Sequence, residues 1–185
     1  GDHDEYIRRY ARDAAAFGGP VLLRYAHEAN GSFHPWSIER PDNSAARFVR
    51  AWRHVHRIFR EEGATNVHFV WTVATQRCPG GCNPYAKVYP GDEFVDVLGF
   101  SRHNWGAHKD RWVPMYEGAA KVAGQLGSLS DKPLMLAEVT SNGEGGDKAA
   151  WIREGYPEVY ERLPAVTAIV YLDADLRPSG HPDWR

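Results

Sequence analysis

Short apolar runs alternate with amphipathic segments along this chain, and that alternation limits the folds open to it. Five runs are predicted to be strands, at residues 21–25, 67–73, 95–100, 134–139 and 167–172. They are mostly continuous rather than alternating in polarity, which is typical of strands buried on both faces of a parallel sheet. The segments between them repeat apolar residues at helical spacing, for example Phe48, Trp52, Val55 and Phe59. The sequence therefore predicts an α/β fold.

The number of these units leaves two architectures open. About five βα units follow an initial helix that ends at Gly18, and a closed eight-stranded (β/α) barrel takes about 250 residues, more than the 185 present here. The sheet is then either open or the C-terminal part of a barrel that lacks its first strands. Gly155 and Pro157 predict an interruption in the last helix. We see no internal repeat or linker, so residues 1–185 are expected to form a single, partial catalytic domain.

Composition excludes several classes of partner. The formal net charge is −2 with 25% charged residues, which is not the basic footprint of a nucleic-acid-binding protein. The sequence contains no run of 18 apolar residues, so it predicts no membrane span. Cys78 and Cys82 bracket Pro-Gly-Gly, and this spacing predicts a small loop disulfide. Such a bond points to an oxidising compartment, so we expect a secreted protein.

Two glutamates follow predicted strands at positions typical of catalytic groups. Glu28 comes just after the first strand, and Glu138 lies at the end of the fourth. Catalytic side chains of (β/α) barrels project from the C-terminal ends of strands. Glycoside hydrolysis needs two such carboxyl groups, one as a proton donor and the other as a nucleophile or general base. A glutamate after a strand is more often a helix cap or a salt-bridge partner, but two in matching positions favour catalysis.

The segments around these residues resemble glycoside hydrolase family 26. Residues 24–36, Arg-Tyr-Ala-His-Glu-Ala-Asn-Gly-Ser-Phe-His-Pro-Trp, are similar to that family's fourth-strand signature. Residues 89–100 resemble its approach to the sixth strand, and residues 132–138 its nucleophile segment. The resemblance implies a (β/α)8 barrel of the TIM type, represented here by strands four to eight. It also implies a retaining endo-enzyme acting on β-1,4-mannan-type polysaccharide.

The resemblance also assigns roles to residues. Glu28 becomes the general acid/base and Glu138 the nucleophile, and retention implies carboxyl groups about 5 to 5.5 Å apart. His27 is expected beside the acid/base, and Arg24 near the carboxylates. Neither a metal nor another cofactor is predicted. The predicted substrate-binding residues are Arg24, His27, Phe33, Trp36, Trp71, Trp105, His103 and Tyr171, with core packing as the competing role of Trp71.

The chain departs from the family pattern in three ways. Phe33 stands where the family usually has Trp, which reduces the stacking surface. His103 stands where it usually has a Tyr that holds the nucleophile, so this bond would depend on pH. The first three strands are missing, and either an N-terminal segment or a second chain is expected to complete the barrel. Asn30 is expected to shape its turn through a left-handed backbone.

Three alternatives remain at this stage. The first keeps the mechanism but changes the substrate to β-glucan (lichenan) or xylan. The second is a non-catalytic carbohydrate-binding relative, which would not need both Glu28 and Glu138. The third is metal-assisted hydrolysis through Asp96, His103 and His108, which is disfavoured because the chain has no His-Glu-x-x-His motif.

Overall fold

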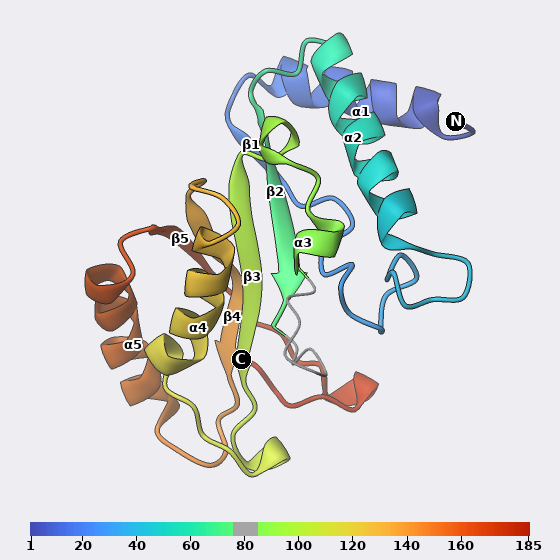
Figure 1. The fold of residues 1–185 in the computed structure, drawn as a ribbon. Coiled ribbons are helices and arrows are strands. Elements are labelled where there is room, and N and C mark those ends of the chain that lie inside the picture. The colour runs from blue at the N-terminus through green and yellow to red at the C-terminus, as the bar shows by residue number, and fades with distance from the viewer. Residues whose placement is uncertain (76–84) are drawn as a thin grey trace. The chain divides into compact units, whose positions relative to one another are not determined.

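The computed structural model describes residues 1–75 and 85–185. The chain divides into two compact units, Gly1–Leu98 and Gly99–Arg185. The strands follow the chain in the order β1-β2-β3-β4-β5, with helices between them (Figure 1). The predicted disulfide between Cys78 and Cys82 lies outside the described residues, and the single-domain expectation stays a prediction.

The first unit is built from helices packed beside a parallel strand pair. It holds helix α1 (Asp4–Phe17), strand β1 (Val21–Leu23), helix α2 (Ala45–Glu61), strand β2 (Val67–Ala74) and helix α3 (Tyr85–Val88). Strands β1 and β2 are parallel, with Val21 opposite Val67. As Figure 1 shows, α1 crosses beside α2, and these helices are in contact. The first strand ends at Leu23, so it is shorter than expected.

Helix α2 follows the sequence pattern closely. The Ser44 hydroxyl accepts a hydrogen bond from the Arg47 amide and caps the helix N-terminus. Phe48, Trp52, Val55 and Phe59 are all buried, which places the predicted apolar stripe against the core. Aromatic rings of Trp52 and Phe59 meet Phe69 of β2 with centroids 5.9 and 5.4 Å apart. This packing attaches the helix to β2 and so positions the strand whose end meets the Glu28 loop.

The second unit carries the remaining strands and two adjacent helices. Strand β3 (Val97–Asn104) runs into it, followed by α4 (Met115–Gly127), β4 (Leu134–Ser141), α5 (Lys148–Arg162) and β5 (Val166–Tyr171). Strands β4 and β5 are parallel. Helices α4 and α5 lie side by side and contact β4 and β5, respectively (Figure 1). The third strand begins two residues later and ends four residues later than predicted.

The predicted interruption of the last helix is wrong. Helix α5 runs without a break from Lys148 to Arg162 with Pro157 inside it. Proline removes the bond to the carbonyl four residues earlier, that of Arg153. Arg153 is exposed, so water can satisfy this carbonyl. Gly155 is buried and lets the helix approach Met115 of α4, where a Cβ would lie 2.7 Å from the Met115 Cβ.

Candidate active site

The loop after β1 holds Glu28 in an uncommon backbone conformation. Ala26 and Glu28 have φ values of 41° and 57°, in the left-handed region that non-glycine residues seldom adopt. The Glu28 amide donates to the Thr72 carbonyl of β2 at 2.8 Å, and the Glu28 carbonyl accepts from the Gly31 amide. The loop is therefore tied to the end of β2 through the backbone of Glu28 itself.

Asn30 stabilises this loop differently from our expectation. Its backbone is not among those with positive φ, so the predicted left-handed turn is wrong at this residue. Its side-chain amide instead donates to the Ala74 carbonyl and accepts from the Ala74 amide, each at 2.9 Å and buried. Buried backbone groups need such partners. Asn30 therefore closes the end of β2, while Glu28 and Ala26 make the left-handed turn.

The Glu28 carboxyl group lies near His34, which belongs to a cluster of aromatic and imidazole rings. Glu28 is 8% exposed, whereas Phe33 is 51% and Trp36 37% exposed, so these rings are open to a ligand. The His34 ring stacks on Trp36 with centroids 4.5 Å apart, and His27 meets the same two rings edge-on. The His34 Nε2 atom lies 3.7 Å from Glu28 Oε2. A buried carboxyl group beside exposed aromatic surface is suited to proton transfer to a bound sugar.

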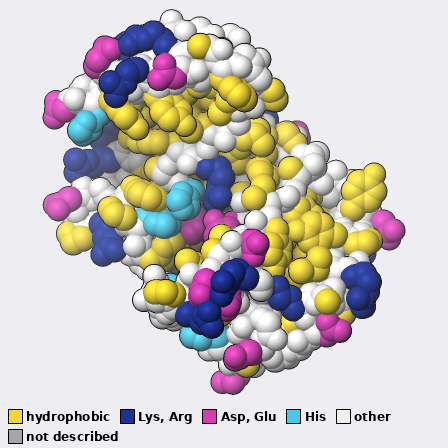
Figure 2. Space-filling view, turned by 180° about the vertical axis from the view of Figure 1, so that it is seen from behind, with side chains coloured by type: hydrophobic (Ala, Val, Ile, Leu, Met, Phe, Trp, Pro, Cys, Tyr) yellow, Lys and Arg dark blue, Asp and Glu magenta, His cyan; other side chains and the backbone are white. Residues whose placement is uncertain are grey.

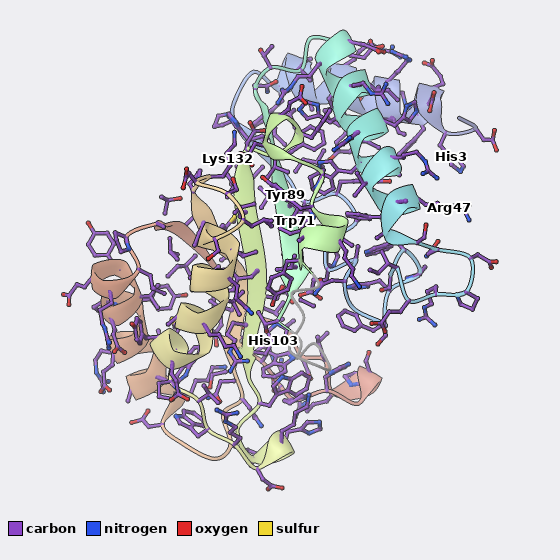
Figure 3. All side chains as sticks on the ribbon, viewed as in Figure 1. His3, Arg47, Trp71, Tyr89, His103 and Lys132 are labelled. Carbon is purple, nitrogen blue, oxygen red and sulfur yellow. The ribbon has the colours of Figure 1, made fainter. Side chains whose placement is uncertain are left out.

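Two further predicted ligand residues, Arg24 and Trp71, lie in the first unit. Arg24 Nε donates to the Thr72 hydroxyl at 3.3 Å, so this residue and Glu28 both bond to Thr72. Trp71 is 1% exposed and meets Tyr89 edge-on at 4.9 Å, and Figure 3 shows the two labelled residues near each other. Burial of this kind favours a packing role for Trp71 over a sugar contact.

In the second unit, His103 lies against Glu138. The His103 Nε2 atom is 3.3 Å from Glu138 Oε1, and both side chains are partly buried, at 22% and 25% exposure. Figure 3 shows His103 near the C-terminal end of β3 and Lys132 ahead of β4, at opposite ends of these strands. The imidazole is therefore placed where the sequence predicted a substitute for the tyrosine hydroxyl, and the role itself stays a prediction.

A buried amide network fixes the strand ends around this pair. The Asn104 side chain donates to the Ser141 hydroxyl and accepts from the Val113 amide, each at 2.9 Å. The Asn104 carbonyl accepts from the Asn142 amide, also at 2.9 Å. These bonds connect the C-terminal ends of β3 and β4. His103 lies one residue before the end of β3, and Glu138 lies three residues before the end of β4. The bonds therefore hold these two residues in a fixed register.

The other predicted ligand residues of this unit, Trp105 and Tyr171, both contact Trp184. The Trp105 ring is half-buried and lies within 6.1 Å of His103, while Lys109 Nζ sits 3.6 Å above it. Trp184 is 1% exposed and packs between His103 and Trp105. The Tyr171 hydroxyl, at the end of β5, donates to the Trp184 carbonyl at 3.4 Å. Trp105 and Tyr171 thus surround a buried Trp184 that keeps the last residues against β3 and β5.

His34, which was not among the predicted site residues, lies against Glu28. The signal was present, because an ionisable residue stands inside the run Phe-His-Pro-Trp, six positions after Glu28. Its contact with the carboxyl group depends on the left-handed turn at Glu28, which the sequence did not predict.

Among the described residues, no group of three or more metal-ligating side chains occurs and no helix is long and apolar enough to cross a membrane.

Comparison with known proteins shows the family to which this chain belongs. The model of glycosyl hydrolase family 26 matches residues 7–144. The chain belongs to this family. Endoglucanase H of Acetivibrio thermocellus is 35% identical over the whole chain, which spans 20% of that protein. Beta-1,3-xylanase TXYA of a Vibrio species is 32% identical over 75% of the chain, covering 27% of that protein.

A solved structure establishes the fold of this family 26 chain. The β-mannanase of Bacteroides ovatus aligns with all of the chain and 54% of its own length, with a TM-score of 0.71 and 20% identity. The fold is therefore a partial (β/α) barrel, and the open-sheet alternative is not needed. The chain therefore spans well under a third of the length of the curated relatives it matches, 20% and 27% for the two named above.

Proposed function

We propose that this chain carries the catalytic residues of a retaining endo-β-glycoside hydrolase that cleaves a polysaccharide by double displacement. Glu28 is the general acid/base, and Glu138 is the nucleophile. The observation that carries the proposal is the pair of carboxyl groups of a family 26 chain, each with an imidazole nitrogen within 4 Å. A residue that only packs a strand end has no need of that arrangement.

The chemistry divides into two steps. Glu138 attacks the anomeric carbon while Glu28 gives its proton to the departing glycosidic oxygen, which leaves a covalent glycosyl-enzyme. Glu28, now ionised, takes a proton from water, whose oxygen attacks the same carbon and releases Glu138. His103 at 3.3 Å orients the Glu138 carboxylate for the first attack. The exposed rings of Phe33 and Trp36 offer apolar faces on which sugar rings stack.

β-Glucan is the substrate we place first. A relative that matches the whole chain at 35% identity is named an endoglucanase, whereas the β-mannanase structure is 20% identical and supports the fold alone. β-1,4-Mannan, the expectation from the family resemblance, is the second candidate, followed by xylan. Phe33 in place of the usual Trp supports a substrate other than ordinary mannan.

The test is polymer cleavage by the full-length protein. We expect reducing sugar from lichenan above that from mannan and xylan, with a rapid fall in viscosity that reports endo cleavage. Glu138→Ala should reduce cleavage by a factor on the order of 10³ or more, because the covalent step is lost. Glu117→Ala is the matched control, since Glu117 is exposed on α4. Tight polymer binding without cleavage would instead identify a non-catalytic sugar-binding protein.

The proposal includes a segment that completes the sheet. Strand β1 exposes 52% of Leu22, and β5 exposes 45% of Val170. Figure 2 shows hydrophobic side chains gathered on its right-hand side, over α5 and β5. Tyr156, Val159, Tyr160, Val166, Ala168 and Ile169 line a hollow of about 580 Å³ there. We propose that further βα units, from an N-terminal segment or a second chain, cover these strands.

Secretion is part of the same proposal, because a polymer too large to enter a cell must be cut outside it. Detection of the protein in the culture medium rather than in the cell pellet would test this. The described residues contain no membrane-spanning helix.

A further inference from the structure

His34 contacts its own loop through both its backbone and its ring. The His34 amide donates to the Ser37 hydroxyl, and the His34 carbonyl accepts from the Ser37 amide, both at 3.1 Å. Its ring lies nearly parallel to the Trp36 indole, at 13°, and the Phe33 ring meets it edge-on at 4.6 Å. The Trp36 indole is itself anchored, because its Nε1 donates to the His27 carbonyl at 2.7 Å. The imidazole therefore has little freedom to turn away.

The inner nitrogen of this ring faces Glu28. Its Nε2 atom is shielded from solvent and has no hydrogen-bond partner among the residues that the structure describes. Glu28 Oε2 lies 3.7 Å away, beyond a good hydrogen bond but within ion-pair range. The other ionisable groups around His34 are the His27 ring, edge-on at 4.6 Å, and Arg40, whose Nε donates to the His34 carbonyl. A shielded nitrogen this close to a single carboxyl group needs that group as its partner.

We propose that His34 is a positioning residue whose imidazolium pairs with the ionised Glu28 carboxylate during turnover. The proposal rests on the assignment of Glu28 as the acid/base. A sub-ångström approach converts the 3.7 Å contact into a charge-assisted hydrogen bond from Nε2 to Oε2. The stack on Trp36 directs this bond, and the burial of Glu28 strengthens it.

The proton balance of the reaction is unchanged by this pair. In the first step the Glu28 proton goes to the glycosidic oxygen, and in the second step a water proton returns to Glu28. His34 keeps its own proton while Glu28 is ionised and transfers none to the substrate. Its contribution is to hold the carboxylate in place between the two steps, when a free carboxylate would otherwise turn toward water.

The proposed pair predicts how the pH dependence of the reaction changes when the imidazole is removed. A cation placed beside a carboxyl group favours the ionised form of that group. Removal of the imidazole should therefore move the basic limb of kcat/KM to higher pH, on the order of one unit.

The experiment measures pH profiles of kcat/KM for the full-length protein on lichenan. His34→Phe keeps an aromatic ring for the Trp36 stack but removes the charge, and His34→Gln keeps polarity but loses both ring and charge. We expect both variants to shift the basic limb upward alike, because they share only their neutrality. The control is His68→Phe, at an exposed histidine of β2, which should leave the limb in place. An unmoved limb in both His34 variants would overturn the proposal.

A second measurement separates this proposal from the assignment of Glu28. An aryl glycoside with a good leaving group needs little protonation, so Glu28→Ala should cleave it far better than it cleaves polymer. If that rescue occurs and the His34 limb does not move, only the pairing of His34 is wrong. If Glu28→Ala cleaves polymer normally, the acid/base assignment fails, and the pairing fails with it.

Discussion

At the scale of single residues, burial of an ionisable group sets a condition on stability. His56 on α2 is 9% exposed, and its ring meets Phe69 and Phe94 edge-on at 4.9 and 5.3 Å. Burial lowers the pKa of His56 below its usual 6.5, and the nearby Arg60 lowers it further, against smaller opposing effects of Asp96 and Glu93. The imidazole is therefore neutral in the folded protein under conditions where the unfolded chain would bind a proton.

The consequence is a loss of stability in mild acid. Because the folded pKa of His56 lies below the unfolded value, its contribution is complete above about pH 6.5 and disappears as pH falls through the folded pKa. Urea unfolding between pH 8 and pH 5 should show a smaller acid-induced decrease in the free energy of unfolding for His56→Phe than for the wild type. His68→Phe, at an exposed position, should keep the wild-type slope. Equal slopes in all three proteins would contradict this account.

At the scale of helices, two glycines should respond to the same substitution with opposite signs. Gly155 of α5 is buried against Met115 of α4, and an added Cβ would lie 2.7 Å from the Met115 Cβ. Gly155→Ala should therefore destabilise the protein by about 1–3 kcal/mol through overpacking. Gly124 on α4 is exposed and has no atom within 4 Å of an added Cβ, so Gly124→Ala should stabilise by about 0.5–1 kcal/mol. Thermal unfolding measures both, and a stabilised Gly155→Ala would show that α4 and α5 are not in close contact.

Whether an element could be predicted from the sequence depends on whether local sequence or a tertiary contact determines it. The apolar stripe from Phe48 to Phe59 and the Ser44 cap depend on local periodicity, and both were predicted correctly. Helix α5 was predicted with an interruption, because Pro157 weakens a helix locally while the packing of Gly155 on α4 is a tertiary contact. The strand pattern predicted a glutamate at the end of each of two strands; in the structure Glu28 follows the end of β1 by five residues, and Glu138 lies within β4, three residues before its end. The contact of His34 with Glu28 depends on a left-handed φ of 57° at a residue with no glycine-like signal.

At the scale of the whole molecule, the composition of the two edge strands indicates whether further strands cover them. Strand β1 pairs with β2, and β5 pairs with β4, and these are the ends of the strand order among the described residues. Edge strands that native proteins leave open usually carry charges or prolines. Val-Leu-Leu of β1 and Val-Thr-Ala-Ile-Val-Tyr of β5 carry neither. This composition supports covered strands in the full-length protein, within a barrel completed by further βα units.

Covered and open edges predict different results for one substitution. Leu22 is 52% exposed in this chain, so Leu22→Lys should change stability by no more than about 0.5 kcal/mol if β1 is an open edge. If further strands cover β1, the same change buries an unpaired charge and should cost about 3 kcal/mol or more in the full-length protein. Hydrogen exchange of the full-length protein gives an independent measure, since covered β1 and β5 amides should be protected as well as those of β2 and β4. We expect the larger loss and the full protection, and a tolerated Leu22→Lys with rapidly exchanging β1 and β5 amides would mean that the sheet ends at these strands.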